Sequence, residues 1–313
     1  MMGMLNILKT PGITSHGVVN RLRRLSGIKK IGHAGTLDPQ AAGVLPVCMG
    51  AATKMIPFMD HRKKTYRVEM KLGVTTDTQD LTGQIIAKSS DIPMEDEVKQ
   101  IFTHFLGDYW QVPPMYSAIK QHGKKLYELA RIGQEVLRAP RKRNVDRIQW
   151  ISMENDLVLF DVVCSEGTYV RTLCHDAGQQ LGCGAAMAFL LRMESCRLPI
   201  NEAVAVEELE ADIYWQDSVI PVDQALTHHP MVHVPESGWK RIINGMPVNE
   251  YTLSIQSDLT TALAEKHDEN LLVRVYLIND VISDEFIGMG AINEESGQLT
   301  MTKRLPLSAA ISF

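Results

Sequence analysis

The sequence from residue 32 to residue 47 reads GHAGTLDPQAAGVLPV, and the fold is organised around it. Its three glycines can adopt backbone angles that other residues avoid, and Pro39 pushes the residue before it out of the α region. Asp38 is therefore presented on a stiff turn, in front of an apolar run that reads as a buried strand. An isolated Asp-Pro pair is more often a loop whose aspartate bonds its own backbone, so a chemical role for Asp38 needs support from elsewhere in the chain.

Length and composition are those of a globular protein with one large and one small domain. The chain has 313 residues, of which 45% are hydrophobic and 22% are charged. Its five cysteines form no C-x-x-C pair, which argues against a zinc site or a disulfide framework and favours a reducing compartment. The first ten residues lack the features of a signal peptide, and no apolar run approaches the roughly 20 residues of a membrane helix. We therefore expect a cytoplasmic protein with no membrane partner.

Charge is divided unevenly along the chain. Residues 1–147 hold 23 Lys and Arg against 13 Asp and Glu, a net charge of +10, whereas residues 148–313 hold 9 against 24, a net charge of −15. Contacts from Lys and Arg to phosphates supply most of the sequence-independent affinity for nucleic acid, so a polyanion should meet the first half. The alternative is a pair of solvated faces of opposite sign.

Hydrophobic periodicity predicts the elements of the first half. A helix is expected from Ser15, which would cap it, to a stop at Gly27, and arginines cover its outer surface. Residues 65–72 alternate as a half-buried strand, with Tyr66 at the head of the apolar face. Taken alone, such a tyrosine is more often a core residue than a catalytic one.

Arg171 lies where residues 156–164, a predicted strand, give way to a helix. The helix dipole favours acids in a first turn, so an arginine there is not a cap and needs another reason, the alternative being a plain surface residue. The turn-rich loop of residues 73–83 carries Asp77 and Asp80, which are too few ligands for a metal site.

Three later segments differ in charge. Residues 117–147 hold nine basic residues against three acidic ones and predict a flexible basic arm, with a solvated surface as the alternative. Residues 201–223 are acidic and read as a linker with a short helix. Beyond residue 230, an amphipathic helix and strand-like runs at 271–278 and 285–292 predict a small β domain.

Several motifs together resemble the bacterial tRNA pseudouridine synthase B family. The stretch quoted first resembles the catalytic motif of that family, and further matches lie at 9–15, 64–66, 111–120, 167–171 and 190–192. The resemblance covers nearly all of the first 225 residues, with the motifs in the family's order. Departures from the usual residues occur at Thr10, Leu191 and the pair Cys196-Arg197.

The resemblance implies an α+β fold. A mixed, largely antiparallel central sheet with flanking helices, the pseudouridine synthase catalytic fold, would span residues 1–225, with a thumb-like insertion around 111–145. A small C-terminal PUA-like β-barrel that binds RNA would span residues 230–313, although its motif content is weak.

The resemblance also implies the chemistry, which is isomerisation of uridine to pseudouridine at position 55 in the T-loop of tRNA, after the base is flipped out. Asp38 is implied as the nucleophile, Tyr66 as the residue that stacks on the base and moves a proton, and Arg171 as the partner of Asp38. The implied substrate-binding residues are His33, Lys9, Lys64, Asp80, Leu190, Arg141, Lys142 and Arg143. The reaction needs neither metal nor cofactor, and we expect a monomer with no obligate protein partner.

Three other functions remain open from the sequence. A glycoside hydrolase would need a second carboxylate near Asp38, for which the 73–83 loop offers Asp77 and Asp80 but no aromatic sugar platform. A non-catalytic tRNA-binding or tRNA-folding protein would explain the charge asymmetry but not the separate motifs around Asp38, Tyr66 and Arg171. A guide-dependent pseudouridine synthase shares those motifs, and the thumb-like insertion favours the stand-alone enzyme.

Overall fold

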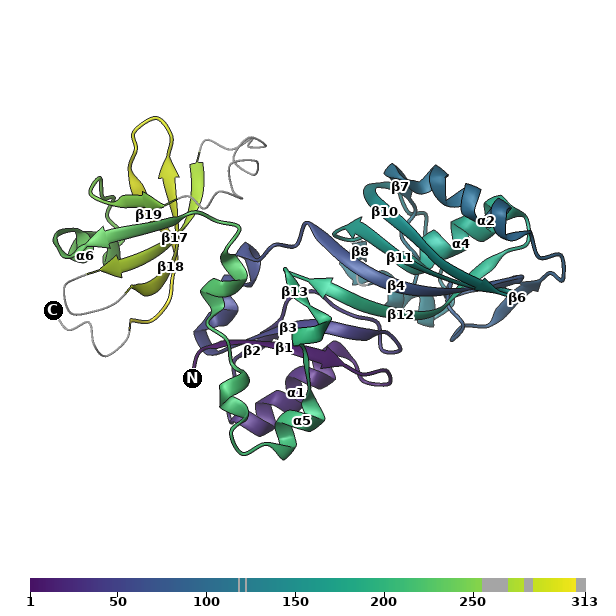
Figure 1. Cartoon of the computed structure of the whole chain (residues 1–313), viewed down its shortest axis with the longest axis horizontal. Coiled ribbons are helices and arrows are strands. Elements are labelled where there is room, and N and C mark those ends of the chain that lie inside the picture. Colours follow the sequence, from purple (N-terminus) through teal and green to yellow (C-terminus); the bar gives the residue numbers. More distant parts are fainter. Residues whose placement is uncertain (118, 122, 255–269, 279–283, 308–313) are drawn as a thin grey trace.

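Two sheets of unequal size make up the protein (Figure 1). The structure, a computed structural model, describes residues 1–117, 119–121, 123–254, 270–278 and 284–307. Among these residues no helix is long and apolar enough to cross a membrane.

The larger sheet has ten strands, eight of them in the order β14-β1-β3-β12-β4-β11-β10-β7, with β2 paired to β3 and β13 to β12. Only the β1–β14 and β3–β12 pairs are parallel. The predicted mixed, largely antiparallel sheet with flanking helices is therefore confirmed. The strands are β1 (Gly3–Lys9), β2 (Ile31–His33), β3 (Ala42–Met49), β4 (Lys63–Leu72), β7 (Gly107–Gln111), β10 (Arg141–Glu154), β11 (Leu157–Ser165), β12 (Ala185–Ser195), β13 (Leu198–Pro199) and β14 (Val204–Ala205).

Helices cover each half of this sheet. Helices α2 (Glu95–Phe102) and α4 (Val170–Leu181) pack on β4 and β11, and α1 (Ser15–Ser26) packs on β1 and β3 (Figure 1). Gly27 ends α1 in the left-handed region, as the sequence predicts. The predicted cap is wrong, because Thr14 caps the helix by accepting from the Gly17 backbone, and the hydroxyl of Ser15 binds elsewhere.

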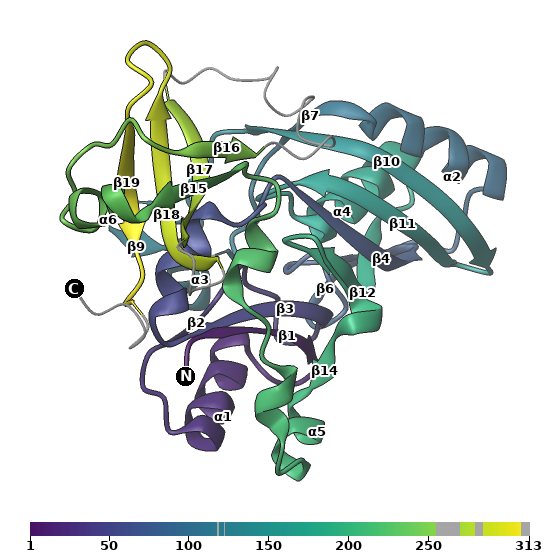
Figure 2. The same ribbon diagram turned by 60° about the vertical axis from the view of Figure 1, so that its left-hand side comes forward.

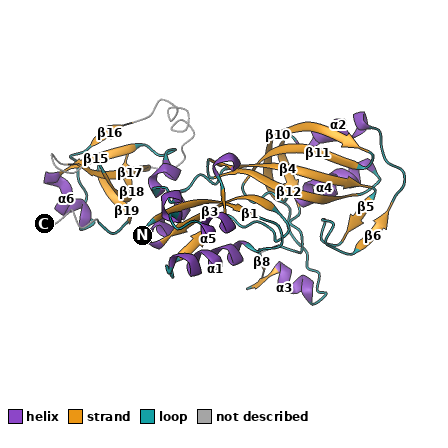
Figure 3. Ribbon diagram, turned by 60° about the horizontal axis from the view of Figure 1, so that its bottom comes forward, coloured by secondary structure: helices purple, strands orange, loops and turns teal. Residues whose placement is uncertain are grey.

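The chain leaves the sheet between β7 and β10. Gln111 and Arg141 are paired neighbours, so residues 112–140 start and finish at one place on the sheet edge. This excursion holds the short hairpin of β8 (Lys120–Gln121) and β9 (Lys124–Lys125) and helix α3 (Leu126–Arg131), and it stands apart from the sheet in Figure 3. The predicted basic arm is wrong for residues 141–143, which belong to β10 because backbone pairing with β7 holds them.

The acidic segment predicted as a linker packs on the large sheet instead. Helix α5 (Val206–Ala211) lies beside α1, and Leu209 and Trp215 are buried in the same core (Figure 3). Arg21 of α1 pairs with Glu207 and Glu210. One arginine of that helix is therefore neutralised within the protein and is a poor candidate for holding RNA.

The smaller sheet has the order β16-β15-β17-β18-β19 and is flanked by α6 (Glu236–Ile243) (Figure 2). It contacts the large part through an apolar core that joins Met289 and Leu305 to Met4 and Val44. Its PUA-like barrel character remains a prediction. The strands are β15 (Met231–Pro235), β16 (Thr252–Ser254), β17 (Asn270–Ile278), β18 (Glu285–Asn293) and β19 (Leu299–Arg304), and a separate hairpin pairs β5 (Val74–Thr76) with β6 (Ile85–Lys88).

Candidate active site

Asp38 lies on a loop between β2 and β3 that side chains hold from two directions. The hydroxyl of Ser15 accepts from the Leu37 amide over 2.9 Å and donates to the Leu37 carbonyl over 3.1 Å. The fully buried ammonium of Lys9 donates to the carbonyls of Pro39 and Ala41 over 3.0 and 2.5 Å. The residues on both sides of Asp38 are thus fixed, and Lys9 contacts the loop from within the protein, away from the solvent where a substrate contact was expected.

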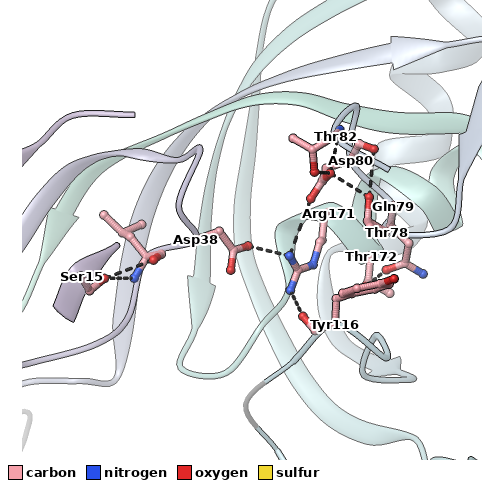
Figure 4. Close-up of polar contacts among 10 residues, drawn as sticks. Ser15, Asp38, Thr78, Gln79, Asp80, Thr82, Tyr116, Arg171 and Thr172 are labelled. Atoms are coloured by element: carbon pink, nitrogen blue, oxygen red, sulfur yellow. Dashed lines mark hydrogen bonds and ion pairs between the residues drawn. The ribbon is translucent and has the colours of Figure 1, made fainter. Parts of the chain in front are cut away.

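Arg171 meets Asp38 from the first turn of α4. Its Nη1 donates to Oδ2 of Asp38 over 2.7 Å, and its Nη2 donates to the carbonyl of Tyr116 over 2.5 Å. The Arg171 side chain is 7% exposed, whereas the Asp38 side chain is 41% exposed. The solvent-facing carboxylate is therefore held by a buried cation (Figure 4). This contact explains why an arginine, which does not cap the helix, lies in its first turn.

Asp80 approaches the same nitrogen of Arg171 as Asp38 does (Figure 4). One of its carboxylate oxygens is 3.7 Å from Nη1 of Arg171, while the other accepts from the hydroxyls of Thr78 and Thr82 over 2.8 and 2.5 Å. Gln79 has a positive φ of 66° and accepts from the hydroxyl of Thr172, next to Arg171. This loop is thus bonded both to itself and to α4, which fixes a second carboxylate against the guanidinium.

Tyr66 and Leu190 form the apolar side of the site. Both side chains are buried, and the two residues lie on the adjacent strands β4 and β12 within one core. Burial raises the pKa of the Tyr66 phenol to about 12. The phenol is therefore protonated at neutral pH and can donate a proton or a hydrogen bond.

Lys64 is buried and His33 is half-buried. The Lys64 ammonium is 3.9 Å from a Glu166 oxygen, and burial lowers its pKa. His33 ends β2, burial lowers its pKa, and its buried Nδ1 has no hydrogen-bond partner among the residues that the structure describes. A neutral, half-buried ring at the end of β2 is suited to stacking on a base.

The basic residues of β10 point to two faces of the sheet, because successive side chains of a strand alternate. Arg143 lies over Gly167, just before α4, and Arg141 shares its face by register. Lys142 faces the opposite way and pairs with Asp108 over 2.8 Å. The structure therefore brings Arg141 and Arg143 toward the loop before α4 but separates Lys142 from them.

Sequence reasoning missed Gln111 and Tyr116. The buried amide of Gln111 donates to the carbonyl of Tyr169 over 3.0 Å and accepts from the Tyr169 amide over 2.8 Å, which fixes the start of α4. Tyr116 acts through its backbone carbonyl, which no side-chain pattern can reveal. Within the described ranges, no three His, Cys, Asp or Glu side chains are grouped as metal ligands would be.

Comparison with known proteins decides the family. Residues 23–170 match the model of the N-terminal domain of TruB family pseudouridylate synthases, and residues 171–229 match the model of the tRNA pseudouridylate synthase B C-terminal domain. The chain is 42% identical over 307 residues to a tRNA pseudouridine synthase B of Alkaliphilus oremlandii, which covers 98% of both chains. A protein of the same name from Clostridium perfringens is 41% identical over 301 residues, 96% of this chain and 98% of the relative.

The chain belongs to the tRNA pseudouridine synthase B family. The family and the class of enzyme expected from the motifs are therefore confirmed. Among solved structures, one titled as a Cbf5-Nop10-Gar1 complex is 25% identical, with a TM-score of 0.72 over 97% of this chain and 84% of that one. In this member of the family, Asp38 falls in the N-terminal match and Arg171 is the first residue of the C-terminal match, so their ion pair joins the two.

Proposed function

We propose that this chain converts uridine 55 in the T-loop of tRNA to pseudouridine. The observation that carries the proposal is the half-exposed carboxylate of Asp38, held by the buried guanidinium of Arg171 beside the protonated phenol of Tyr66. The name shared by relatives about 40% identical over nearly the whole chain supports the substrate.

The reaction balances without a redox partner. The bond between N1 of uracil and C1′ of the ribose breaks, the detached base turns, and C5 bonds to C1′ in its place. One proton leaves C5 and one is bound at N1, so no electrons are gained or lost. In this scheme Asp38 is the nucleophile at the sugar, Arg171 aims the carboxylate through their hydrogen bond, and Tyr66 stacks on the base and moves a proton.

The uridine must leave the RNA stack before it reaches such a site, which costs a few kcal/mol. In our proposal the ring of His33 takes the vacated place, and Arg141 and Arg143 contact phosphates beside the site. Five free buried cysteines fit a reducing compartment, so we place the enzyme in the cytoplasm, acting as a monomer without a guide RNA.

The geometry argues against a glycoside hydrolase. The second carboxylate of such an enzyme must carry a proton to the leaving group. Asp80 shares the guanidinium of Arg171 with Asp38 and accepts hydrogen bonds from the hydroxyls of Thr78 and Thr82. Its oxygens are thus occupied within the protein by Arg171 and two hydroxyls, and none of these contacts presents the carboxyl group to a leaving group.

The decisive experiment uses the purified chain, an unmodified tRNA transcript and no other RNA or protein. Pseudouridine mapping after incubation should give one modified position, residue 55, and a transcript with cytidine at that position should remain unmodified. Modification only after a guide RNA is added would favour the guide-dependent enzyme. Tight binding with no pseudouridine at any position would favour a tRNA-folding protein and overturn the proposal.

A further inference from the structure

Arg192, in the middle of β12, is among the largest fully buried side chains of the described chain, with 1% of its surface exposed. Its guanidinium donates to three backbone carbonyls, from Nε to Val44 over 2.7 Å, from Nη2 to Gly35 over 3.1 Å and from Nη1 to Thr36 over 3.4 Å. These carbonyls lie on both sides of Asp38 in the sequence. One side chain therefore holds the start and the end of the loop that carries the proposed nucleophile.

Arg192 is also a sheet neighbour of Tyr66. Arg192 and Tyr66 are direct partners in the antiparallel pairing of β12 with β4. Burial raises the pKa of the Tyr66 phenol, and a hydrogen bond and the charge of Arg192 act on it in the opposite direction. Arg192 thus binds the loop of Asp38 and lies directly across from Tyr66 in the sheet.

Packing alone does not explain an arginine at this position. A buried charge is costly unless it is paired, and among the described residues Arg192 forms no ion pair with a carboxylate. Its surroundings add to the cost, since the ammonium groups of Lys9 and Lys64 are close enough for Arg192 to reinforce the lowering of their pKa by burial. An apolar side chain would avoid these penalties but would lose the three hydrogen bonds to these carbonyls.

We propose that Arg192 is a positioning residue that ties the loop of Asp38 to the strand of Tyr66 and so sets the spacing between the nucleophile and the phenol. This inference rests on the proposed function of those two residues. Gly43 makes the tie possible, because a Cβ at Gly43 would lie 2.2 Å from the carbonyl oxygen of Arg192. The loop can therefore approach β12 closely enough for the guanidinium to reach across it.

The first test measures single-turnover rates on tRNA with saturating enzyme, so that affinity does not enter. Arg192→Met should slow the reaction at least about 100-fold, with the tRNA Kd within about threefold of the parent. Arg192→Lys keeps the charge but reaches fewer partners, so its single-turnover rate should lie between those of the parent and of Arg192→Met. If Arg192 acts through the phenol, the double variant Arg192→Met with Tyr66→Phe should lose far less rate than the product of the two single fold-losses in rate.

The matched control is Arg274→Gln. Arg274 is also a buried arginine, bonded to the carbonyl of His229 and the hydroxyl of Tyr276, but it lies in the smaller sheet. Its loss should lower the melting temperature while leaving the single-turnover rate within about twofold. If Arg274→Gln lost as much rate as Arg192→Met, the effect of Arg192 would be one of stability alone, and the inference would be overturned.

Hydrogen exchange of the amides of residues 34–45 gives a readout that needs no activity. Exchange in this loop should be at least about tenfold faster in Arg192→Met than in the parent, and unchanged in Arg274→Gln. Unchanged exchange in Arg192→Met, or strictly multiplicative losses with Tyr66→Phe, would overturn the tie. If the parent makes no pseudouridine at all, the proposed function fails, and the exchange comparison still decides whether Arg192 holds the loop.

Discussion

Arg171 donates a hydrogen bond from Nη1 to Oδ2 of Asp38 over 2.7 Å, across 133 residues of sequence. The other arm of its guanidinium binds the carbonyl of Tyr116, at the start of the 112–140 excursion. The planar group therefore holds the carboxylate and the excursion at once, in directions fixed by its own geometry. Charge alone does not reproduce this arrangement.

We expect Arg171→Lys to lower the single-turnover rate by about 100-fold or more, although it keeps the positive charge. An ammonium on a flexible stem cannot direct two fixed donors to Asp38 and Tyr116. The matched control is Arg67→Lys, because Arg67 makes a two-point pair with Asp161 on the exposed sheet surface, over 2.8 and 2.9 Å. The single-turnover rate of that variant should stay within twofold of the parental rate. A near-parental rate for Arg171→Lys would show that the planar guanidinium is not needed.

Replacing the proposed nucleophile should separate chemistry from binding. Asp38→Asn should abolish turnover and leave the tRNA Kd within about threefold, since loss of a nucleophile removes stabilisation of the transition state and not of the bound complex. Filter binding and pseudouridine mapping on one preparation measure both quantities. The exposed Asp91→Asn serves as control, and residual activity of Asp38→Asn above a few per cent would exclude the nucleophile role.

The alternation along β10 predicts unequal contributions to RNA affinity. Arg141→Ala combined with Arg143→Ala should lower the slope of log affinity against log salt by about one to two, because each lost phosphate contact contributes a little under one. Lys142→Ala should leave that slope unchanged, since Lys142 faces away and pairs with Asp108. Titrations over a range of salt concentrations measure the slopes, and equal effects from the two faces would contradict the assignment.

The sequence was most informative where local pattern or motif carried the information. The helix that ends at Gly27 and the strand headed by Tyr66 follow from periodicity and from the φ that glycine allows. The meeting of Asp38 with Arg171 followed only from the family resemblance, because no local pattern spans 133 residues. Periodicity alone would have left both residues as plain surface or loop positions.

Tertiary contacts decided the features that the sequence did not predict. Thr14 and Ser15 are both residue types that cap helices well. Thr14 caps α1, whereas the hydroxyl of Ser15 binds the backbone of Leu37, which is distant in sequence. Arg21, one of the arginines on the outer surface of that helix, pairs with Glu207 and Glu210, which lie 186 and 189 residues later in the sequence. Such outcomes depend on which segments pack together, and propensity does not encode that.

Acid sensitivity should arise where the smaller sheet joins the larger part. Burial lowers the pKa of His228 to about 3, with a smaller contribution in the same direction from His229, whose ring centroid is 4.1 Å away. The charges of Asp60, Arg197 and Arg62 also act on His228, the first raising its pKa and the other two lowering it. His228 is therefore neutral in the folded protein at any pH where the enzyme works.

The sign of the effect follows from proton binding. The unfolded chain has an ordinary His228, with a pKa near 6.5, so between about pH 6.5 and pH 3 it binds more protons than the folded protein. Stability contributed by neutral His228 is complete above pH 6.5 and is lost as the pH falls, by about 1 to 2 kcal/mol between pH 7 and pH 5 after allowance for partial exposure. His228→Gln should remove this loss, so that free energies of unfolding from urea titrations at pH 7, 6 and 5 fall less steeply than in the parent. His104→Gln, at an exposed histidine, should keep the parental slope, and equal slopes for parent and His228→Gln would mean that this histidine is protonated in the folded state.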